Sequence, residues 1–106
     1  MKGSRLGEFE EITLLAVKAL DRPAYGVPVQ QYVEQATGRH VSIGAVYAAL
    51  ERLEAKGFVE SVYGEATSER GGKRKRLFTV TPVGMRTLKD LRKVRERIWR
   101  TIEERS

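Results

Sequence analysis

The feature that most constrains this chain is a pair of helical patterns joined by a very short link. The first pattern is followed by Gly38, a residue suited to a left-handed helix cap, and the second begins after Ser42, a good N-cap. Only residues 39–41 lie between these two boundaries. A helix, a short turn and a helix in this order predict a helix-turn-helix unit. The apolar faces are Val29, Tyr32, Val33 and Ala36 in the first pattern, and Ile43, Val46, Leu50 and Leu53, a predicted core stripe, in the second.

One more helix is expected before this unit, from about Gly7 to Leu20, and residues 21–23 end it. Leu14 and Val17 add to an already apolar pattern, so we expect this helix to be buried on more than one side. The residues that recur at helical spacing are Phe9, Ile12, Leu15, Ala16 and Ala19.

Two strand-like runs follow the helix-turn-helix unit. Residues 58–63 and 77–81 are rich in aromatic and β-branched side chains. Within the second run Phe78 and Val80 share one face, and we expect them to point inward. Residues 64–76 are polar and contain two adjacent glycines, which predicts a long hairpin loop, or wing.

The last helix is predicted to open at Thr81-Pro82 and to continue to about Glu104. A helix of some 20 residues is about 30 Å long, so it projects beyond a domain this small and its apolar side needs a partner. The fold class is therefore mainly α with a small β-hairpin. We expect a winged helix-turn-helix domain over residues 1–81 and a dimerisation helix over residues 82–106, together one compact unit. The expected dimer contacts are Leu88, Leu91, Val94, Ile98 and Ile102.

Composition narrows the class of partner. The 106 residues suit one domain, and a net charge of +6 favours a polyanion, nucleic acid before an anionic membrane. Charge alone leaves a merely soluble basic protein equally open. Without cysteine there is no disulfide or cysteine-ligated zinc, which agrees with a cytoplasmic protein. The apolar run at residues 12–20 is short and interrupted by Lys18, so we expect neither a signal peptide nor a membrane anchor.

The sequence lacks the catalytic and metal-binding motifs that would indicate an enzyme. Its single histidine, His40, excludes a two-histidine metal site. A glycine pair before Lys73 is reminiscent of a phosphate loop, but Arg74 stands where Ser or Thr is needed. We therefore expect no catalysis, no cofactor and no metal. The acidic residues near helix ends are interpreted as solvated charge: Glu8, Glu10, Glu11, Glu103 and Glu104.

The wing carries the densest positive charge, with no acidic residue among its cations. Adjacent glycines let its backbone approach a ligand closely. Basic side chains on such a hairpin suit phosphate or minor-groove contact, although a charged loop by itself can be only solvated. After a helix-turn-helix pattern, the phosphate interpretation is favoured. The cations are Arg70, Lys73, Arg74, Lys75 and Arg76.

The helix after Ser42 is the candidate for entering a DNA groove. If its apolar stripe faces the core, the residues that face outward are mostly small. A slim face fits the major groove, where Ala or Ser can meet a thymine methyl or a base edge, but small residues are also simply good helix formers. These outward residues are Ser42, Gly44, Ala45, Ala48 and Arg52.

Three further side chains have two interpretations each. Tyr47 flanks the outward face, where its phenol can donate to a phosphate or pack against Glu51 or the wing. His40 lies in the link, and we expect it near the phosphates rather than acting as a pH sensor. Trp99 is the only tryptophan, and it either fills a dimer contact or stacks on a flat ligand.

Residues 6–12, 24–28, 41–57 and 69–84 together resemble the PadR family. The stretch from Ser42 to Tyr47 and the Arg70-Gly-Gly wing, taken together, are quite specific, and the resemblance covers about residues 6–88. It implies a winged-helix repressor that binds palindromic operators as a dimer, through the C-terminal helix with help from the first helix. Some members respond to phenolic acids or flat aromatic drugs, and Trp99 lies on the helix that stacks on the ligand in some of them.

These observations together predict a sequence-specific DNA-binding repressor, a homodimer on a palindromic operator, with double-stranded DNA and a second copy as partners. Trp99 is the candidate site for an aromatic effector, with dimer packing as the other interpretation of this residue. A winged-helix protein-interaction module without DNA binding is the alternative, and a double-stranded RNA binder is weaker because A-form major grooves do not admit a helix. The expected DNA contacts are Tyr25, His40, Ser42, Gly44, Ala45, Tyr47, Ala48, Arg52, Arg70, Lys73, Arg74 and Lys75.

Overall fold

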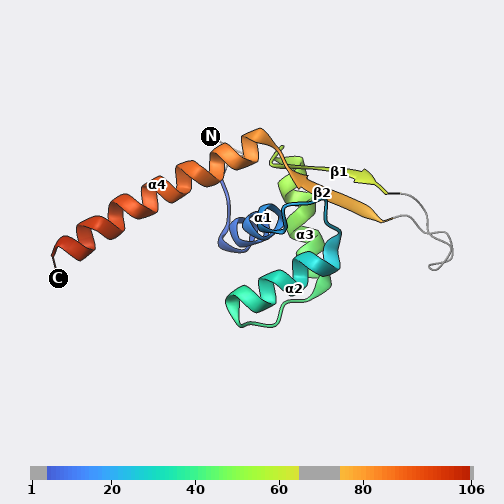
Figure 1. Ribbon diagram of the computed structural model, residues 1–106, viewed down its shortest axis with the longest axis horizontal. Coiled ribbons are helices and arrows are strands. Elements are labelled where there is room, and N and C mark those ends of the chain that lie inside the picture. The colour runs from blue at the N-terminus through green and yellow to red at the C-terminus, as the bar shows by residue number, and fades with distance from the viewer. Residues whose placement is uncertain (1–4, 65–74, 106) are drawn as a thin grey trace.

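The computed structural model describes residues 5–64 and 75–105, which form four helices and a two-stranded antiparallel hairpin (Figure 1). This confirms the predicted fold class, mainly α with a small β-hairpin. The elements in chain order are α1 (Glu8–Leu20), α2 (Gly26–Thr37), α3 (Ile43–Ala55), β1 (Val59–Tyr63), β2 (Arg76–Val80) and α4 (Pro82–Glu104).

The helix boundaries follow from their caps. Gly38 ends α2 in the left-handed conformation with φ 71°, and Asp21 ends α1 with φ 55°. The Ser42 hydroxyl accepts a hydrogen bond from the Ala45 N–H at 3.0 Å, and Thr81 caps α4 in the same way. The caps predicted at Gly38, Ser42 and Thr81 are therefore confirmed.

The link between α2 and α3 is held by side chains of α2. The Gln30 amide donates to the Val41 carbonyl at 2.9 Å, and the Val41 N–H donates to the Glu34 carboxylate at 3.0 Å. Both polar backbone groups of Val41 are thus satisfied within the turn. The angle between α2 and α3 is consequently fixed by hydrogen bonds as well as by packing.

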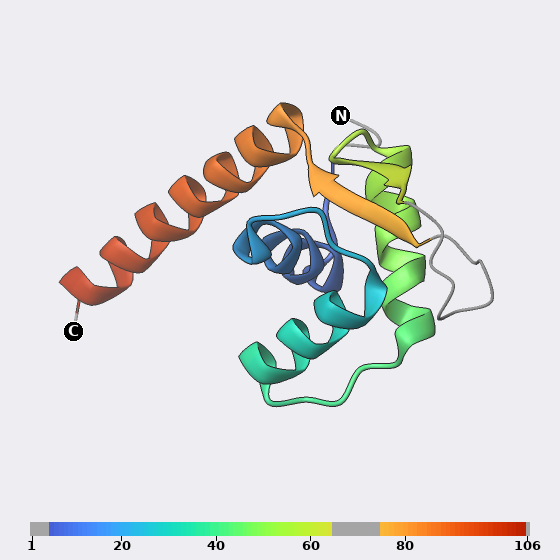
Figure 2. The same cartoon turned by 45° about the vertical axis from the view of Figure 1, so that its right-hand side comes forward.

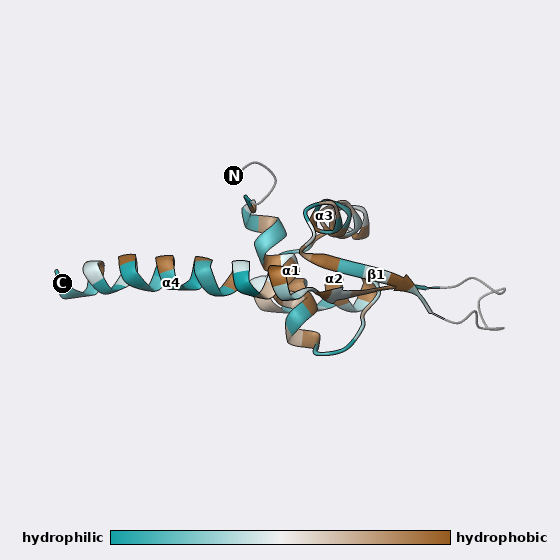
Figure 3. Ribbon diagram, turned by 90° about the horizontal axis from the view of Figure 1, so that it is seen from above, coloured by the Kyte–Doolittle hydropathy of each residue, from teal (hydrophilic) through white to brown (hydrophobic). Residues whose placement is uncertain are grey.

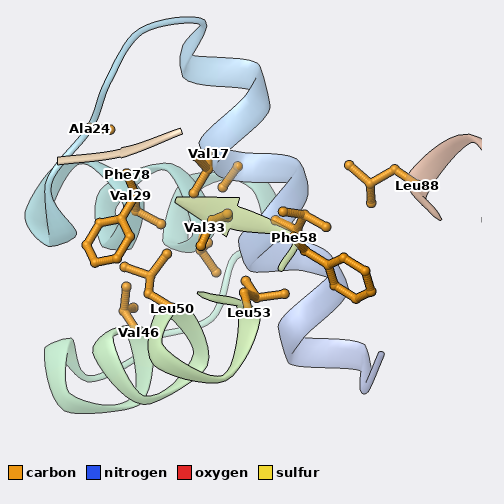
Figure 4. Close-up of a cluster of buried hydrophobic side chains, with 13 residues drawn as sticks. Val17, Ala24, Val29, Val33, Val46, Leu50, Leu53, Phe58, Phe78 and Leu88 are labelled. Carbon is orange, nitrogen blue, oxygen red and sulfur yellow. The ribbon is translucent and has the colours of Figure 1, made fainter. Parts of the chain in front are cut away.

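The core lies where α1, α2, α3 and the hairpin meet. Phe78 from β2 is fully buried, and Figure 4 shows its ring among Val29, Val46 and Leu50. The backbone of Phe78 also exchanges two hydrogen bonds with Ala24, at 2.8 and 3.1 Å. This pairing fixes the hairpin against the segment that leads into α2.

Several predicted core positions are wrong. Ile43, in the first turn of α3, is exposed, whereas Ala49, which the predicted stripe left out, is fully buried. On α1 the buried face centres on Leu14 and Val17, because that side meets α2, α3 and β2. Periodicity alone did not separate this face from the second apolar stripe. The other predicted core residues that are exposed are Leu15, Ala19, Tyr32 and Ala36.

The first turn of α4 packs against Gly57 and Phe58, the residues just before β1. A Cβ on Gly84 would lie 2.2 Å from the Phe58 carbonyl oxygen, so only glycine fits there. The Thr81 hydroxyl donates to the Gly57 carbonyl at 2.7 Å, and the Thr81 N–H donates to the Phe58 carbonyl. The direction in which α4 leaves the rest of the molecule is therefore defined by its first turn.

Beyond Leu88, α4 projects away from the other elements (Figures 1 and 2). The described chain measures 59 × 30 × 22 Å, and a helix of 23 residues is about 35 Å long. Figure 3 shows apolar bands along one edge of this helix. We call residues 89–104 the arm and the remaining described residues the body. No helix in the described ranges is long and apolar enough to cross a membrane.

Candidate nucleic-acid interface

The outward face of α3 is slim. Ser42, Gly44, Ala45 and Ala48 are all exposed, as predicted, while Val46, Ala49, Leu50 and Leu53 pack inward. A Cβ built on Gly44 would meet no atom within 4 Å. The first two turns of α3 thus present a narrow face with small side chains, of a size that the major groove of B-DNA admits. Because α3 is the candidate for entering a DNA groove, we call it the recognition helix.

Tyr47 flanks this narrow face and packs on the start of α2. Its hydroxyl accepts a hydrogen bond from the Gly26 N–H at 3.3 Å, and a Cβ on Gly26 would lie 2.5 Å from its ring. Within the described residues, Gly26 is therefore a packing partner of Tyr47. Because a phenol also carries a donor hydrogen, this arrangement leaves the donor of Tyr47 available for a phosphate.

Lys75, the residue just before β2, also lies beside the start of α2. Lys75 Nζ lies 3.9 Å from the centroid of the Tyr25 ring, a cation–π contact, and Tyr25 is the N-cap residue of α2. The structure thus brings Tyr25, Tyr47 and Lys75 together around the first turn of α2, beside the recognition helix. These residues come from three elements that the sequence analysis could not place side by side.

His40, another predicted contact residue, lies at the surface. Its side chain is 88% exposed, and its Nδ1 lies 2.7 Å from a Glu34 carboxylate oxygen. The same carboxylate oxygen accepts the Val41 N–H, so His40 stands at the surface of the link just before α3.

Arg52 does not point freely toward solvent. Its Nε lies 2.6 Å from Glu10 of α1, and Lys56 Nζ lies 2.7 Å from the other oxygen of the same carboxylate. Glu10 is only 7% exposed, which corrects the expectation that it is solvated charge. Arg52 remains half-exposed, but it is held by this contact between α1 and α3.

The surroundings of Glu10 explain its ionisation. Burial by itself raises the pKa, but hydrogen bonds from Lys56, Arg52 and the Gly7 N–H outweigh burial and lower the pKa of Glu10 to about 2. The position of Glu10 at the third residue of α1 was a usable signal, because a glutamate there commonly bonds back to the residue that precedes the helix. The partners, Arg52 of α3 and Lys56 at its C-cap, are 42 and 46 residues away and left no signal in the sequence.

Arg76 is likewise engaged within the protein. Its guanidinium donates to Glu51 at 2.6 and 3.3 Å, also contacts Glu54, and donates from Nε to the Ser61 hydroxyl at 3.0 Å. Hydrogen bonding to Glu51 raises the pKa of Arg76, and the same bond lowers the pKa of Glu51. Of the five wing cations, Arg76 therefore binds the recognition helix.

The predicted contacts Arg70, Lys73 and Arg74 lie outside the described residues. Lys75 is described and is partly exposed, and its contact with Tyr25 places it beside the start of α2. Within residues 5–64 and 75–105, no group of three histidine or carboxylate side chains lies close enough to hold a metal ion.

The predicted dimer residues fall into two groups. Leu88 is 6% exposed and belongs to the core, which corrects its assignment as a dimer contact: the first turns of α4 lie on the body. Further along, Leu91, Val94, Ile98 and Ile102 form what we call the ridge. Leu91 is partly buried and the other three are exposed, with Ile98 at 57%.

A groove of about 850 Å³ runs between α1 and α4. The Arg95 guanidinium crosses it to bind Glu11 of α1 at 2.6 Å, and this contact raises the pKa of Arg95. Trp99 lines the groove and is 60% exposed. The apolar lining is Leu15, Ala19, Met85, Leu88 and Trp99, and the charged lining is Glu11, Lys18, Lys89, Arg92, Arg95, Glu96, Arg100 and Glu103.

Comparison with known sequences gives a family. The pattern of the transcriptional regulator PadR-like family matches residues 14–90. An uncharacterised protein X of Lysinibacillus sphaericus is 32% identical over 100 residues, which cover 92% of this chain and 84% of that protein. An uncharacterised 37.1 kDa protein in a transposon, from Streptomyces fradiae, is 37% identical over 68 residues. That match covers 64% of this chain but only 18% of the length of the Streptomyces protein.

Solved structures share the fold. A PadR-like transcription factor from Bacteroides fragilis has a TM-score of 0.77 at 21% identity, covering 92% of this chain and 89% of the other. Bacillus subtilis PadR, solved in complex with operator DNA, has a TM-score of 0.66 at 18% identity, covering 78% of this chain and 46% of the other. At these identities the likeness establishes the winged-helix architecture.

Proposed function

This chain belongs to the PadR-like family of transcriptional regulators, a family of regulators rather than enzymes, and from that premise we propose that it is a homodimeric repressor that binds operator DNA through α3. The observation that carries the proposal is the slim face of α3, flanked by Tyr47 and by the Lys75–Tyr25 contact. A narrow helix face can approach base edges in the major groove, and a cation beside it can bind phosphates.

In this proposal the first two turns of α3 occupy the major groove. Ser42, Gly44, Ala45 and Ala48 contact bases, and half-exposed Arg52 lies further along the same helix. The residues at the flanks contact the sugar-phosphate backbone and set the register. These are Tyr25, His40, Tyr47 and Lys75, together with the wing cations Arg70, Lys73 and Arg74.

The ridge on α4 supports a dimer. Residues 82–106 would act as the dimerisation segment and residues 1–81 as the DNA-binding segment. Val94 and Ile98 expose apolar surface on an arm that the body does not cover, and a second copy offers the same surface in return. Two recognition helices related by a twofold axis then sit about 34 Å apart, which makes the operator an inverted repeat.

The groove between α1 and α4 suits a small effector. Trp99 supplies a flat face and Leu15 an apolar wall, while Lys18 and Arg100 supply positive charge at the edge. A planar aromatic ligand fits such a site, and stacking contributes about 0.5–1.5 kcal/mol beyond burial. Titrating phenolic acids and planar dyes while following Trp99 fluorescence tests this part of the proposal: saturable quenching without any change in DNA affinity would contradict it.

The assignment of α3 is tested with Ala45→Glu, which places a carboxylate among base edges and phosphates. We expect this variant to lose binding to duplex DNA. The matched control is Ala55→Glu, which adds the same charge at an exposed position of the same helix, about 15 Å further along. Equal binding by Ala45→Glu and the unmodified protein, measured by gel shift or fluorescence anisotropy, would show that the first turns of α3 do not face DNA.

A further inference from the structure

The contacts of Arg76 join the root of the wing to the recognition helix. Arg76 is the first residue of β2, and its guanidinium meets two carboxylates of α3, Glu51 and Glu54. Its Nε donates to Ser61 of β1, and the Ser61 hydroxyl in turn donates to Glu54 at 2.8 Å. One side chain thus links β2, β1 and α3 in a closed hydrogen-bond network.

The network is shielded on one side. The Arg76 guanidinium lies 5.0 Å from the centroid of the Phe78 ring, and Phe78 belongs to the fully buried core. The Arg76 side chain is only 25% exposed, while Glu51 is 58% exposed. A planar fork with several N–H donors matches this arrangement of two carboxylates and a hydroxyl, whereas a lysine ammonium would act as a single point charge.

The partners of Arg76 lie close to the proposed DNA-contacting face. Glu51 follows Ala48 by about one turn of α3, so its carboxylate stands at the edge of the slim face of α3. The positive charge of Arg76 is matched by these two acidic side chains. Arg76 therefore contributes the orientation of the β1–β2 hairpin relative to α3 rather than free positive charge.

We propose that Arg76 is a positioning residue for DNA recognition: it fixes the wing root against α3 and does not itself bind a phosphate. This inference rests on the proposed function, since it concerns how the two DNA-contacting parts are aligned. It separates Arg76 from its neighbours in the basic run, which remain proposed phosphate contacts. It also assigns Glu51 and Glu54, two acidic residues near the interface, a role in operator preference.

The decisive variant removes the carboxylates and leaves Arg76 in place. Glu51→Gln combined with Glu54→Gln makes each protomer more positive near the DNA, so charge alone predicts tighter binding to every duplex. Positioning predicts the opposite for the operator, because the wing root is no longer held. The probes are a duplex selected by the unmodified protein from a random pool and a scrambled duplex of the same length and composition.

We expect Glu51→Gln/Glu54→Gln to bind the selected duplex about tenfold more weakly, within the usual range of coupling between contacting residues, and the scrambled duplex at least as tightly as before. The matched control, Glu60→Gln combined with Asp21→Asn, makes the same charge change at two exposed carboxylates without ion pairs in the described part of the chain, and should keep its preference. Arg76→Lys, which retains the charge but not the fork, should also lose preference, with its unfolding midpoint recorded alongside.

Tighter or unchanged binding of the selected duplex by Glu51→Gln/Glu54→Gln would overturn the inference, as would a fully retained preference in Arg76→Lys. Either result would leave the proposed function intact, since the unmodified protein would still select a duplex. A protein that selects no duplex at all contradicts the proposed function, and the inference with it.

Discussion

The body and the arm treat their apolar residues in opposite ways. In the body Leu14, Val29, Val46, Leu50 and Phe78 are fully buried against one another, whereas beyond Leu88 the larger apolar side chains of the arm are mostly exposed. The ion pairs differ as well. Pairs such as Glu10–Arg52 and Glu51–Arg76 join distant segments within the body, while the arm pairs Arg92 with Glu96 on the same helix and Arg95 with Glu11 of α1.

This difference indicates which part depends on a partner. Each element of the body is fixed by packing, by caps and by pairs such as Glu10–Arg52, so the body needs no second chain to hide its core. Helix α4 has the length and the apolar edge of a dimerisation helix, but only its first turns, which precede the arm, are covered by the rest of the molecule. The predictions below test that contrast.

The largest effect is expected in the body. Phe78→Ala removes a ring at the centre of the core and should lower the free energy of unfolding by about 3–5 kcal/mol, independently of protein concentration. Urea denaturation measures this. The comparison variant is Ile98→Ala in the arm, whose cost should be smaller and should disappear as the protein is diluted below its dimerisation range, where neither protein is dimeric. An equal, concentration-independent loss in both would remove the distinction.

Acid should weaken the body through Glu10. Because its folded pKa of about 2 lies below the ordinary value of 4.5, the stabilisation is fully present above pH 4.5 and is lost as the pH falls toward 2. The shift corresponds to about 3 kcal/mol. Unfolding free energies between pH 6 and pH 2.5 should therefore fall less in Glu10→Gln than in the unmodified protein. Parallel profiles for the two proteins would contradict the assigned ionisation.

The arm should respond to a charge on the ridge. Ile98→Asp places an unpaired carboxylate in the proposed dimer contact and should raise the dimer dissociation constant by about thirtyfold, or 2 kcal/mol. The control is Lys93→Asp, an exposed position outside the ridge. Analytical ultracentrifugation distinguishes the two variants. An unmodified protein that stays monomeric and folded at high concentration would refute the role given to the arm.

The helix boundaries and the exposed face of α3 could be predicted from the sequence. Caps at Gly38, Ser42 and Thr81 are set by neighbouring residues, and the exposed small face of α3 follows once its helical period is known. The errors arose where distant segments decide. Ile43 has the right spacing for the core but no element covers it, and Leu15 faces the groove beside α4.

Charged residues show the same limit more sharply. Glu10 and Arg76 each lie in a run of like-charged neighbours, so the sequence indicates a solvated acidic start for α1 and a free cation in the wing. Their partners are 42 and 25 residues away along the chain. Only the fold brings them together, and it turns both into contacts that hold α3.

The central claim, that this chain is a dimeric DNA-binding protein, is tested most directly by the salt dependence of its affinity for duplex DNA. If Lys75 and the wing residues Arg70, Lys73 and Arg74 each neutralise one phosphate, a dimer neutralises about eight, because Arg52 and Arg76 are engaged by carboxylates. A plot of log K against log salt concentration should then have a slope of about −7. A slope shallower than about −2 would contradict the account.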